Sequence, residues 1–318
     1  SKDFETGRNC FGPRLHEFIH ALFGREKTAH LFTVGECWVD DIDEMRRHCA
    51  AERGELSTLF QFDHMECGRT EKFTPKEDSL RTVRDVLIRW QEKTAEYDLL
   101  QSLFSDNHDQ PPLISRAADD GEKRYESATC LAAMFYLLKG VPFIYQGQEI
   151  GMTNVHFDTI DDYDERYTVG KYYTAVEAGE DPEVALARLR PTSRDNARTP
   201  YQWDNSENAG FTTGKPWIKV NPRYTEINYA ADRASENSIF EFYKKLIAMR
   251  KTCPAIIDGD FKFLLMDHPQ MVMYLRKCAR QTLLVVANFS DDAVKTEWPE
   301  ELKEFTWQRL LTNREETA

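Results

Sequence analysis

Four short, unbroken apolar runs dominate the first half of the chain, and each of them ends in polar residues. They are HLFTVGE (30–36), LSTLFQFDHM (56–65), LLQSLFSDNHDQ (99–110) and VPFIYQGQE (141–149). Runs rich in Phe, Leu, Val and Ile that lack polar alternation are typical of strands buried on both faces. Such strands need a covering layer on each face, which limits the folds that are open to the chain.

Helical patterns occupy the intervals between these runs. We predict helices over 40–54, ending at Gly54, over 77–93 and over 124–140, the first with the weakest pattern. The third segment stops being apolar at Lys139-Gly140, which is a good helix ending. Strands that alternate with helices form βαβ units, so the pattern predicts an α/β fold with a parallel sheet. In the second helix, apolar residues recur at helical spacing, at Leu80, Val83, Leu87 and Trp90.

The final third of the chain has a different pattern. An amphipathic helix is predicted over 237–251, and three apolar runs with turn-like gaps follow it, at 261–267, 271–277 and 282–290. Successive short strands separated by turns favour an antiparallel sheet. We therefore predict two domains, 1–253 and 254–318, with the boundary near Cys253-Pro254. Within the first domain, residues 154–233 are rich in Asp, Tyr, Pro and Asn, and we expect them to pack beside the sheet as a long excursion.

Charge and cysteine usage exclude several classes of function. The formal net charge of −13 argues against a nucleic-acid surface, because phosphate binding needs clustered Lys and Arg. No apolar run is long enough to span a bilayer, so no membrane partner is expected. The seven cysteines form no Cys-x-x-Cys pair, which favours reduced thiols and a cytoplasmic location. No metal-ligand spacing and no glycine-rich phosphate loop occurs, so we expect no metal and no cofactor.

Chemically active side chains gather where the four predicted strands end. In a parallel barrel the catalytic residues lie at the carboxyl ends of the strands. A lone Glu after a strand is usually a surface residue, and NHDQ by itself also fits a polar turn. The joint pattern over four strands favours an active site. Its members are Glu36 after the first run, Asp63-His64 after the second, Asn107-His108-Asp109-Gln110 after the third, and Gln146, Gln148 and Glu149 after the fourth.

Two of these carboxylates, Glu36 and Asp109, suit the hydrolysis of glycosides. In that reaction one carboxylic acid protonates the leaving oxygen while another carboxylate stabilises or attacks an oxocarbenium-like centre. His108, beside Asp109, could donate a hydrogen bond to a sugar hydroxyl. The residue types therefore predict a carbohydrate site at this edge of the sheet.

The segment TSRDNARTPYQWD (192–204) contributes two arginines, Arg194 and Arg198. Taken alone, it fits a surface salt-bridge cluster around Asp195. Alternatively, the planar fork of guanidinium donors positions a carboxylate and a substrate hydroxyl. The spacing leaves both interpretations open.

Several longer motifs resemble those of one enzyme family. TVGE, FQFDHM, NHDQP, KGVPFIYQGQEIGMTN, RDNARTPYQWD and AGFTTGKPWIKVNPRYTEIN are similar to the α-amylase superfamily, glycoside hydrolase family 13. Within it they look most like the oligo-1,6-glucosidase and α-glucosidase branch. The resemblance implies a (β/α)8 barrel followed by an antiparallel β-sandwich domain. It also implies exo-acting, retaining hydrolysis of short α-glucosides such as isomaltose-type oligosaccharides.

The resemblance also implies a role for each candidate residue. Glu36 looks like the general acid/base on the fifth barrel strand. Asp109 looks like the carboxylate that holds the substrate hydroxyls and stabilises the transition state. Arg194 is similar to the arginine that contacts the non-reducing glucose, with Arg198 supporting it. The residues implied to bind substrate beside Asp109 are Asn107, His108 and Gln110.

One part of the family pattern is missing. The family's nucleophile is an Asp at the tip of the fourth strand, in a stretch like GFRMD, and no such stretch occurs. Asp3 is the only Asp before Glu36, and it lacks both the motif and a preceding strand. A complete barrel needs about 250 residues or more, and Glu36 comes almost at the start of the chain. We therefore expect the C-terminal half of a barrel, with strands five to eight, and no turnover by this chain alone.

Two further departures concern the substrate surface. Pro112 stands where the family usually has Arg, which changes one contact on the leaving-group side. SRAADD replaces the family's SRFG, which removes an aromatic residue after Arg116.

Other functions remain open at this stage. The chain could be a non-catalytic module that binds carbohydrate or assembles with a partner, or a glucosyl transferase or sucrose isomerase of the same superfamily. The exposed edges of half a barrel would favour self-association. The sequence does not distinguish α-1,6 from α-1,4 linkages or phosphorylated from plain substrates.

Overall fold

The structure, a computed structural model, describes residues 21–22, 31–39, 41–52, 56–66, 69–71, 74–75 and 79–314. Its strands are β1 (Val34–Glu36), β2 (Thr58–Phe60), β3 (Arg69–Glu71), β4 (Thr74–Pro75), β5 (Ser102–Leu103), β6 (Val141–Pro142), β7 (Asp260–Leu264), β8 (Met271–Lys277) and β9 (Thr282–Asn288). Its longer helices are α4 (Ile42–Cys49), α6 (Ser79–Glu96), α8 (Arg124–Tyr136), α9 (Arg166–Glu177), α10 (Pro182–Leu189) and α12 (Ile239–Thr252).

Shorter helical turns connect these elements. They are α5 (Asp63–Glu66), α7 (Leu113–Ala117), α11 (Tyr229–Ala234) and α13 (Pro254–Asp258), together with the 3₁₀ turns η1 (Gln148–Ile150), η2 (Ile160–Asp162), η3 (Arg190–Thr192), η4 (Arg194–Ala197), η5 (Glu207–Gly210), η6 (Pro222–Thr225) and η7 (Glu300–Leu302).

Two pairs of parallel strands support the candidate site. β1 pairs with β2, and β5 pairs with β6. Thr58 of β2 joins the two pairs, because its hydroxyl donates to the carbonyl oxygen of Leu100 (2.5 Å) and lies 3.0 Å from the Ser102 hydroxyl of β5. The predicted parallel strands are confirmed, although they are much shorter than the apolar runs. That they form half of an eight-stranded barrel stays a prediction, as do the two domain ranges.

The predicted helices are found, with shifted ends. α6 and α12 lie close to the segments 77–93 and 237–251. α4 begins where the Asp41 side chain accepts from the Glu44 amide, and it ends at Cys49 because Ala50 turns to an extended conformation. The expected ending at Gly54 lies outside the described residues.

α8 also ends before its predicted end at Gly140. The helix stops at Tyr136, and the chain then turns toward β6. Gly140 has a φ of +149°, and a Cβ atom there would lie 2.4 Å from the carbonyl oxygen of Gln101. Only glycine fits this close approach, which brings β6 beside β5.

Two arginines bind the carbonyl groups that α8 leaves unpaired at this end. Arg250 of α12 donates to the carbonyl oxygens of Tyr136 (2.5 Å) and Gly140 (2.6 Å). Arg276 of β8 donates to the carbonyl oxygen of Leu137 (2.9 Å) and, through its other nitrogens, to those of Ile256 and Gly259. Helix ends carry unpaired carbonyl groups and a partial negative charge, so cations stabilise them.

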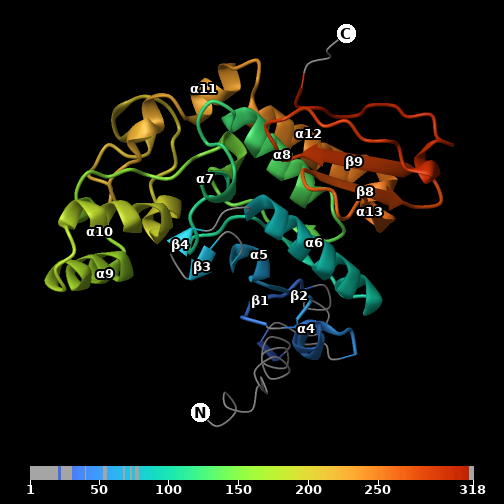
Figure 1. Cartoon of the computed structure of the whole chain (residues 1–318), viewed down its shortest axis with the longest axis horizontal. Helices are drawn as coiled ribbons and strands as arrows, with labels where there is room; N and C mark the ends of the chain where they lie inside the picture. The colour runs from blue at the N-terminus through green and yellow to red at the C-terminus, as the bar shows by residue number, and fades with distance from the viewer. Residues whose placement is uncertain are drawn as a thin grey trace.

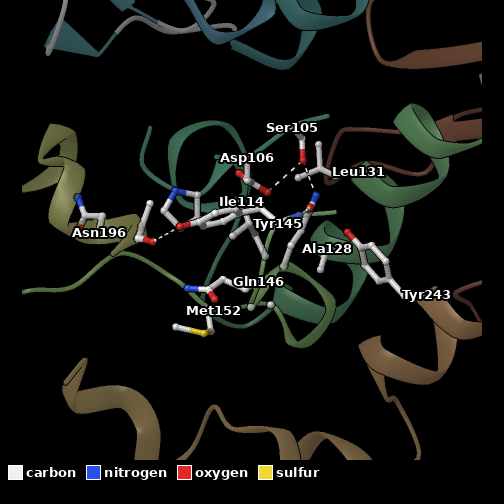
Figure 2. A pocket seen from close by; sticks show the side chains of 15 residues that line it. Ser105, Asp106, Ile114, Ala128, Leu131, Tyr145, Gln146, Met152, Asn196 and Tyr243 are labelled. Atoms are coloured by element: carbon white, nitrogen blue, oxygen red, sulfur yellow. Dashed lines mark hydrogen bonds between the residues drawn. The ribbon is translucent and has the colours of Figure 1, made fainter. Parts of the chain in front are cut away.

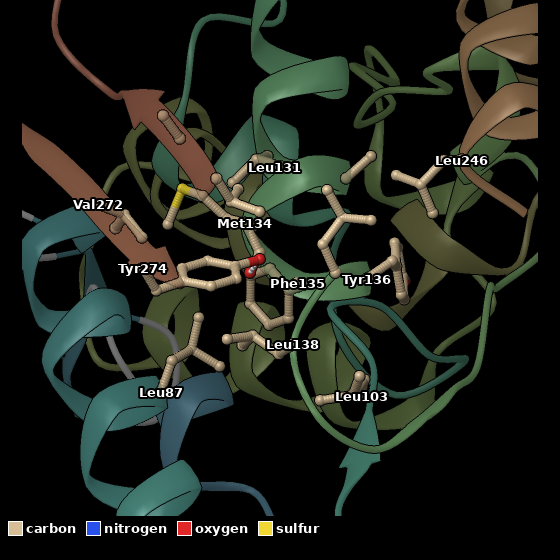
Figure 3. Packing of buried hydrophobic residues seen from close by; sticks show 14 of the residues in the cluster. Leu87, Leu103, Leu131, Met134, Phe135, Tyr136, Leu138, Leu246, Val272 and Tyr274 are labelled. Carbon is tan, nitrogen blue, oxygen red and sulfur yellow. Dashed lines mark hydrogen bonds between the residues drawn. The ribbon is translucent and has the colours of Figure 1, made fainter. Parts of the chain in front are cut away.

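The antiparallel strands β7, β8 and β9 form one sheet, as predicted for the final third. β8 is the central strand and is buried on both faces. Val272 and Tyr274 face the helices, and the Tyr274 hydroxyl donates to the Ala133 carbonyl oxygen of α8 (3.0 Å). Figure 3 shows Tyr274 reaching from the strand toward Phe135. Met271, Met273 and Leu275 pack on the other face in a separate cluster.

The segment 154–233, predicted to be a long excursion, contains α9 and α10, which pack against each other. Figure 1 shows these two helices on the side of the molecule away from β8 and β9. Asp195 is buried in this excursion and accepts from the backbone amides of Asp164 (2.8 Å) and Glu165 (3.0 Å). This carboxylate therefore ties the start of α9 to the turn η4.

No helix in the described ranges is long and apolar enough to cross a membrane. No group of three or more His, Cys, Asp and Glu side chains in these ranges is arranged to hold a metal ion.

We predict that Arg276→Ala lowers the free energy of unfolding by about 3 kcal/mol or more, because it leaves several buried carbonyl groups without a donor. Arg276 is fully buried, whereas Arg280 of the same hairpin is 71% exposed in a pair with Asp258. Arg280→Ala is the matched control and should change stability by less than about 0.5 kcal/mol. Urea unfolding of the three proteins measures the difference. Equal stability of the two variants would contradict the role of Arg276.

Candidate active site

The predicted site after β5 is built on a tight polar turn. The Asp109 amide donates to the Asn107 side-chain oxygen (2.9 Å), and the backbones of Asn107 and Gln110 form an isolated bridge. This Asn-centred turn leaves His108 exposed and Gln110 buried. The two interpretations of NHDQ are therefore compatible, because the polar turn is what presents His108 and Asp109.

Both predicted arginines point at the Asp109 carboxylate. Nη2 of Arg198 lies 2.5 Å from its Oδ1, and Nη1 of Arg194 lies 3.4 Å from the same oxygen. The three side chains are each between 27% and 29% exposed, so the cluster is partly shielded from solvent. Partial burial strengthens such pairs relative to a fully exposed salt bridge. The surface-cluster interpretation around Asp195 is wrong, since Asp195 is buried and bonded to the backbone of the excursion.

The turn and the arginines are tied together by more than charge. Nε of Arg198 donates to the His108 carbonyl oxygen (2.7 Å), so one guanidinium binds both the backbone and the carboxylate of the turn. The imidazole Nε2 of His108 lies 3.8 Å from Asp109 Oδ1. Nε of Arg194 is buried and has no hydrogen-bond partner among the described residues. Buried donors are normally satisfied, so this N–H is an exception among the described residues.

Glu36 is the last residue of β1 and is exposed. It lies opposite Phe60 of β2, whose ring packs edge-on against Phe104 (4.9 Å) and Phe143 (4.7 Å). These aromatic contacts pack the residues that follow β5 and β6 against the last residue of β2. No hydrogen bond or ion pair joins Glu36 to the Asp109 cluster in the described ranges, and the Glu36 carboxylate is accessible to solvent.

The polar residues after β2 serve the fold. Asp63 accepts from Arg89 (2.5 Å) and from the Trp90 indole (2.8 Å), which ties the end of β2 to α6. Gln61 accepts from the Asp63 amide, so its NH₂ group donates to Nδ1 of His64 (3.0 Å). His64 is buried against the Phe104 ring.

The polar residues after β6, Gln148 and Glu149, form hydrogen bonds with other side chains around the candidate site. Glu149 accepts from the Tyr201 hydroxyl (2.7 Å), and Gln148 lies in a buried polar network with Ser105. Sequence reasoning missed Tyr145, whose hydroxyl donates to the Ala197 carbonyl oxygen of η4 (2.9 Å). No periodicity or spacing points to this bond, because its partner is a backbone atom far along the chain. Asp3 lies outside the described residues.

The arrangement has a definite chemical capacity. A carboxylate held by two guanidinium groups can accept hydrogen bonds from neighbouring hydroxyls and stabilise a developing positive charge. An exposed carboxyl group at a strand end, such as that of Glu36, can exchange protons with a bound ligand. Both are features of a site for polyhydroxylated substrates.

The sequence is similar to known proteins along nearly its whole length. The profile of the alpha amylase catalytic domain matches residues 4–259, and that of the maltogenic amylase C-terminal domain matches residues 261–318. An oligo-1,6-glucosidase of Bacillus cereus is 41% identical over 307 residues, which cover 95% of this chain and 55% of that protein. A trehalose-6-phosphate hydrolase of Escherichia coli (strain K12) is 38% identical over 96% of this chain and 56% of that protein.

Solved structures show the same similarity. The crystal structure of Bacillus licheniformis trehalose-6-phosphate hydrolase superposes with a TM-score of 0.84 at 38% identity, over 92% of this chain and 53% of that chain. Isomaltulose synthase from Erwinia rhapontici NX5 superposes with a TM-score of 0.76 at 37% identity, over 88% and 51%. The chain spans about half the length of the curated relatives that it matches.

The burial of His64 predicts a pH dependence of stability. Burial, and then the charge of Arg116, lower the pKa of His64 from 6.5 to about 3. Between these values the unfolded chain binds more protons than the folded one, so stability is lost as the pH falls below about 6.5. We expect wild type to lose about 1.3 kcal/mol more than His64→Gln between pH 7.0 and 5.5. Urea unfolding at both pH values measures this.

The exposed His156 offers a control, because His156→Gln should keep the pH dependence of wild type. A His64→Gln variant with the same pH dependence as wild type would show that this histidine is not held neutral in the fold.

Proposed function

Because the chain belongs to the α-amylase family, glycoside hydrolase family 13, we propose that it carries part of the catalytic site of a retaining, exo-acting α-glucosidase. The convergence of Arg194 and Arg198 on Asp109 is the observation that carries the proposal. The similarity to oligo-1,6-glucosidases supports short α-glucosides, such as isomaltose-type oligosaccharides, as substrates.

The proposed roles rest on the family resemblance and are supported by the contacts of the cluster. Asp109 accepts hydrogen bonds from the hydroxyls of the bound glucose, and its charge stabilises the oxocarbenium-like transition state. Arg198 holds this carboxylate and the turn in place, and the Arg194 guanidinium, which faces the same carboxylate, contacts the non-reducing glucose. His108 donates to the same sugar, with Asn107 and Gln110 shaping the turn around it.

Glu36 is the proposed general acid/base. It protonates the leaving oxygen in the first step and removes a proton from water in the second. Its exposed position at the end of β1 allows it to reach both leaving group and water.

Retention requires a second carboxylate that forms a covalent bond to the sugar. The 318 residues contain no stretch like the family's GFRMD motif. We propose that these residues correspond to strands five to eight of the barrel and that another polypeptide segment supplies the nucleophile. The chain alone is then catalytically inactive.

We predict that the purified chain does not hydrolyse p-nitrophenyl α-glucoside, and that adding a separately made N-terminal part of a related oligo-1,6-glucosidase produces activity. The reason is that the covalent intermediate needs the missing carboxylate. Release of p-nitrophenol measures turnover, and the anomer first formed, followed by NMR, tests retention. Turnover by the chain alone would contradict the proposed absence of a nucleophile.

Glu36→Gln should reduce activity in the mixture by a factor of about 100 or more, because it removes the proton donor. Glu52, an exposed carboxylate that follows α4, provides the matched control, and Glu52→Gln should retain full activity. No activity in any mixture would favour a non-catalytic module that binds carbohydrate or assembles with a partner.

A glucosyl transferase or sucrose isomerase is the second candidate, supported by the similarity to isomaltulose synthase. The two candidates differ in the acceptor of the glucosyl group. Incubation of an active mixture with sucrose separates them, since a hydrolase releases glucose and fructose while an isomerase returns a disaccharide.

We also propose self-association and a cytoplasmic location. β1 is paired on one edge in the described residues, and Val34 is 38% exposed although it lies in a strand. Unpaired strand edges and exposed apolar side chains favour association. The free thiols at Cys37, Cys49, Cys130, Cys253 and Cys278 fit a reducing compartment.

We predict that the purified chain forms a dimer or larger species, because β1 offers an edge for another strand. Light scattering coupled to size-exclusion chromatography measures the mass. A single species of 37.1 kDa would contradict self-association.

A further inference from the structure

A small cavity lies behind the Asp109 turn, with a volume of about 30 Å³. This is room for roughly one water molecule. Its lining comes from separate segments: Ser105 and Asp106 after β5, Tyr145 after β6, and Asn196 with Ala197 from η4. Figure 2 shows Asp106 beside Ser105, and Tyr145 extending to the opposite side, toward Asn196. The cavity therefore marks the place where the turn and the arginine segment meet.

Asp106 closes the loop that carries Asp109. One of its carboxylate oxygens accepts from the Leu113 amide (2.5 Å), at the first residue of α7, and the other accepts from the Ser105 hydroxyl (3.0 Å). The residue before α7 is Pro112, whose side chain makes no capping hydrogen bond. Asp106 thus accepts the hydrogen bond of the first helical amide, which the Pro112 side chain cannot do. This bond joins the two ends of the loop 106–113.

Gln148 links this loop to the segment after β6. Its side-chain oxygen accepts from the Tyr145 amide (3.2 Å) and from the Tyr136 hydroxyl (2.9 Å). Because the oxygen is occupied by donors, the NH₂ group faces Ser105 and donates to its hydroxyl oxygen. The Ser105 proton is then directed to Asp106. The two donors on the Gln148 oxygen therefore fix the orientation of its amide, and the amide in turn fixes that of the Ser105 hydroxyl.

Tyr145 connects the network to the arginines. Its hydroxyl donates to the Ala197 carbonyl oxygen (2.9 Å), and Ala197 lies between Arg194 and Arg198 in sequence. Burial raises the pKa of the Tyr145 phenol, the charge of Arg198 lowers it, and Asp106 and Asp109 raise it further. The charges of Arg198 and of both carboxylates therefore act on the phenol. The phenol stays protonated and can donate its hydrogen bond to Ala197.

We propose that Tyr145 is a positioning residue that holds η4 so that Arg194 and Arg198 meet Asp109. Asp106 holds the loop that carries Asp109, and Ser105 and Gln148 link this carboxylate to the segment after β6. Tyr145 and Asp106 both act through their contacts within the protein. Their effect on catalysis rests on the proposed function, whereas their effect on the geometry of the cluster does not.

The first test measures that geometry without any turnover. Tyr145→Phe removes one hydroxyl and should speed solvent exchange of the Arg198 Nε–H, which donates to the His108 carbonyl oxygen, by a factor of about 10. Exchange is followed in ¹⁵N NMR spectra of the arginine Nε groups. Tyr274→Phe is the matched control, because Tyr274 also donates to a backbone carbonyl oxygen (3.0 Å) but lies between β8 and α8. It should leave the exchange of the Arg198 Nε–H unchanged.

Two outcomes would overturn the proposal. One is unchanged exchange in Tyr145→Phe. The other is an equal increase in Tyr274→Phe, which would reflect general loss of stability. A second pair of variants tests the opposite side: Asp106→Ala should speed the exchange, and Asp106→Asn, which keeps an acceptor for the Leu113 amide, should restore most of the protection.

The second test uses the mixture that restores activity. Tyr145→Phe should lower kcat/KM for p-nitrophenyl α-glucoside by a factor of about 10, because a small displacement of the arginines misplaces Asp109. Tyr274→Phe should leave it unchanged. If no mixture is active, the proposed function fails, while the exchange measurement still decides whether Tyr145 positions the cluster. An active mixture that is insensitive to Tyr145→Phe would overturn the catalytic part of this inference alone.

Discussion

The carbonyl groups at the end of α8 are the point on which the rest of the architecture depends. Arg250 from α12 and Arg276 from β8 both donate to them, so one helix end joins the parallel strands, the last long helix and the antiparallel sheet. Directly after this end, Gly140 allows β6 to approach β5. A buried guanidinium is costly unless its donors find acceptors, and here backbone carbonyl oxygens accept from both arginines. The position of β6, and with it Tyr145, follows from this arrangement.

The candidate site combines two segments that are distant in sequence. Asp109 comes from a turn after β5, and Arg198 comes from the excursion 89 residues later. Each is stabilised within its own segment, the turn by Asn107 and the excursion by buried Asp195. Because each segment is held by its own hydrogen bonds, the ion pair between them needs little additional ordering. Preorganised charge of this kind stabilises a transition state without reorganisation during the reaction, which is the property that a glycosidase site requires.

Several expectations came directly from local patterns, and several features had no local signal. The helical spacing of Leu80 and Trp90 located α6, and the runs 271–277 and 282–290 located β8 and β9 to the residue or nearly so. His64 looked like a site residue because it follows a strand, but its ring is buried beside Phe104. Polarity in sequence does not reveal whether a side chain faces a ligand or a core, because that depends on which ring packs beside it.

The sequence by itself determined the types of element, their order, the family, and the residue types placed at the strand ends, because periodicity and turn residues act over a few positions. It could not determine that Arg194 and Arg198 share one oxygen of Asp109, or that Tyr145 donates to Ala197. Those contacts join segments that meet only when the helices pack, and the partner is in part a backbone atom that every residue possesses. The tertiary structure alone decided them, since a hydrogen bond to backbone leaves no trace in the identity of the residue that accepts it.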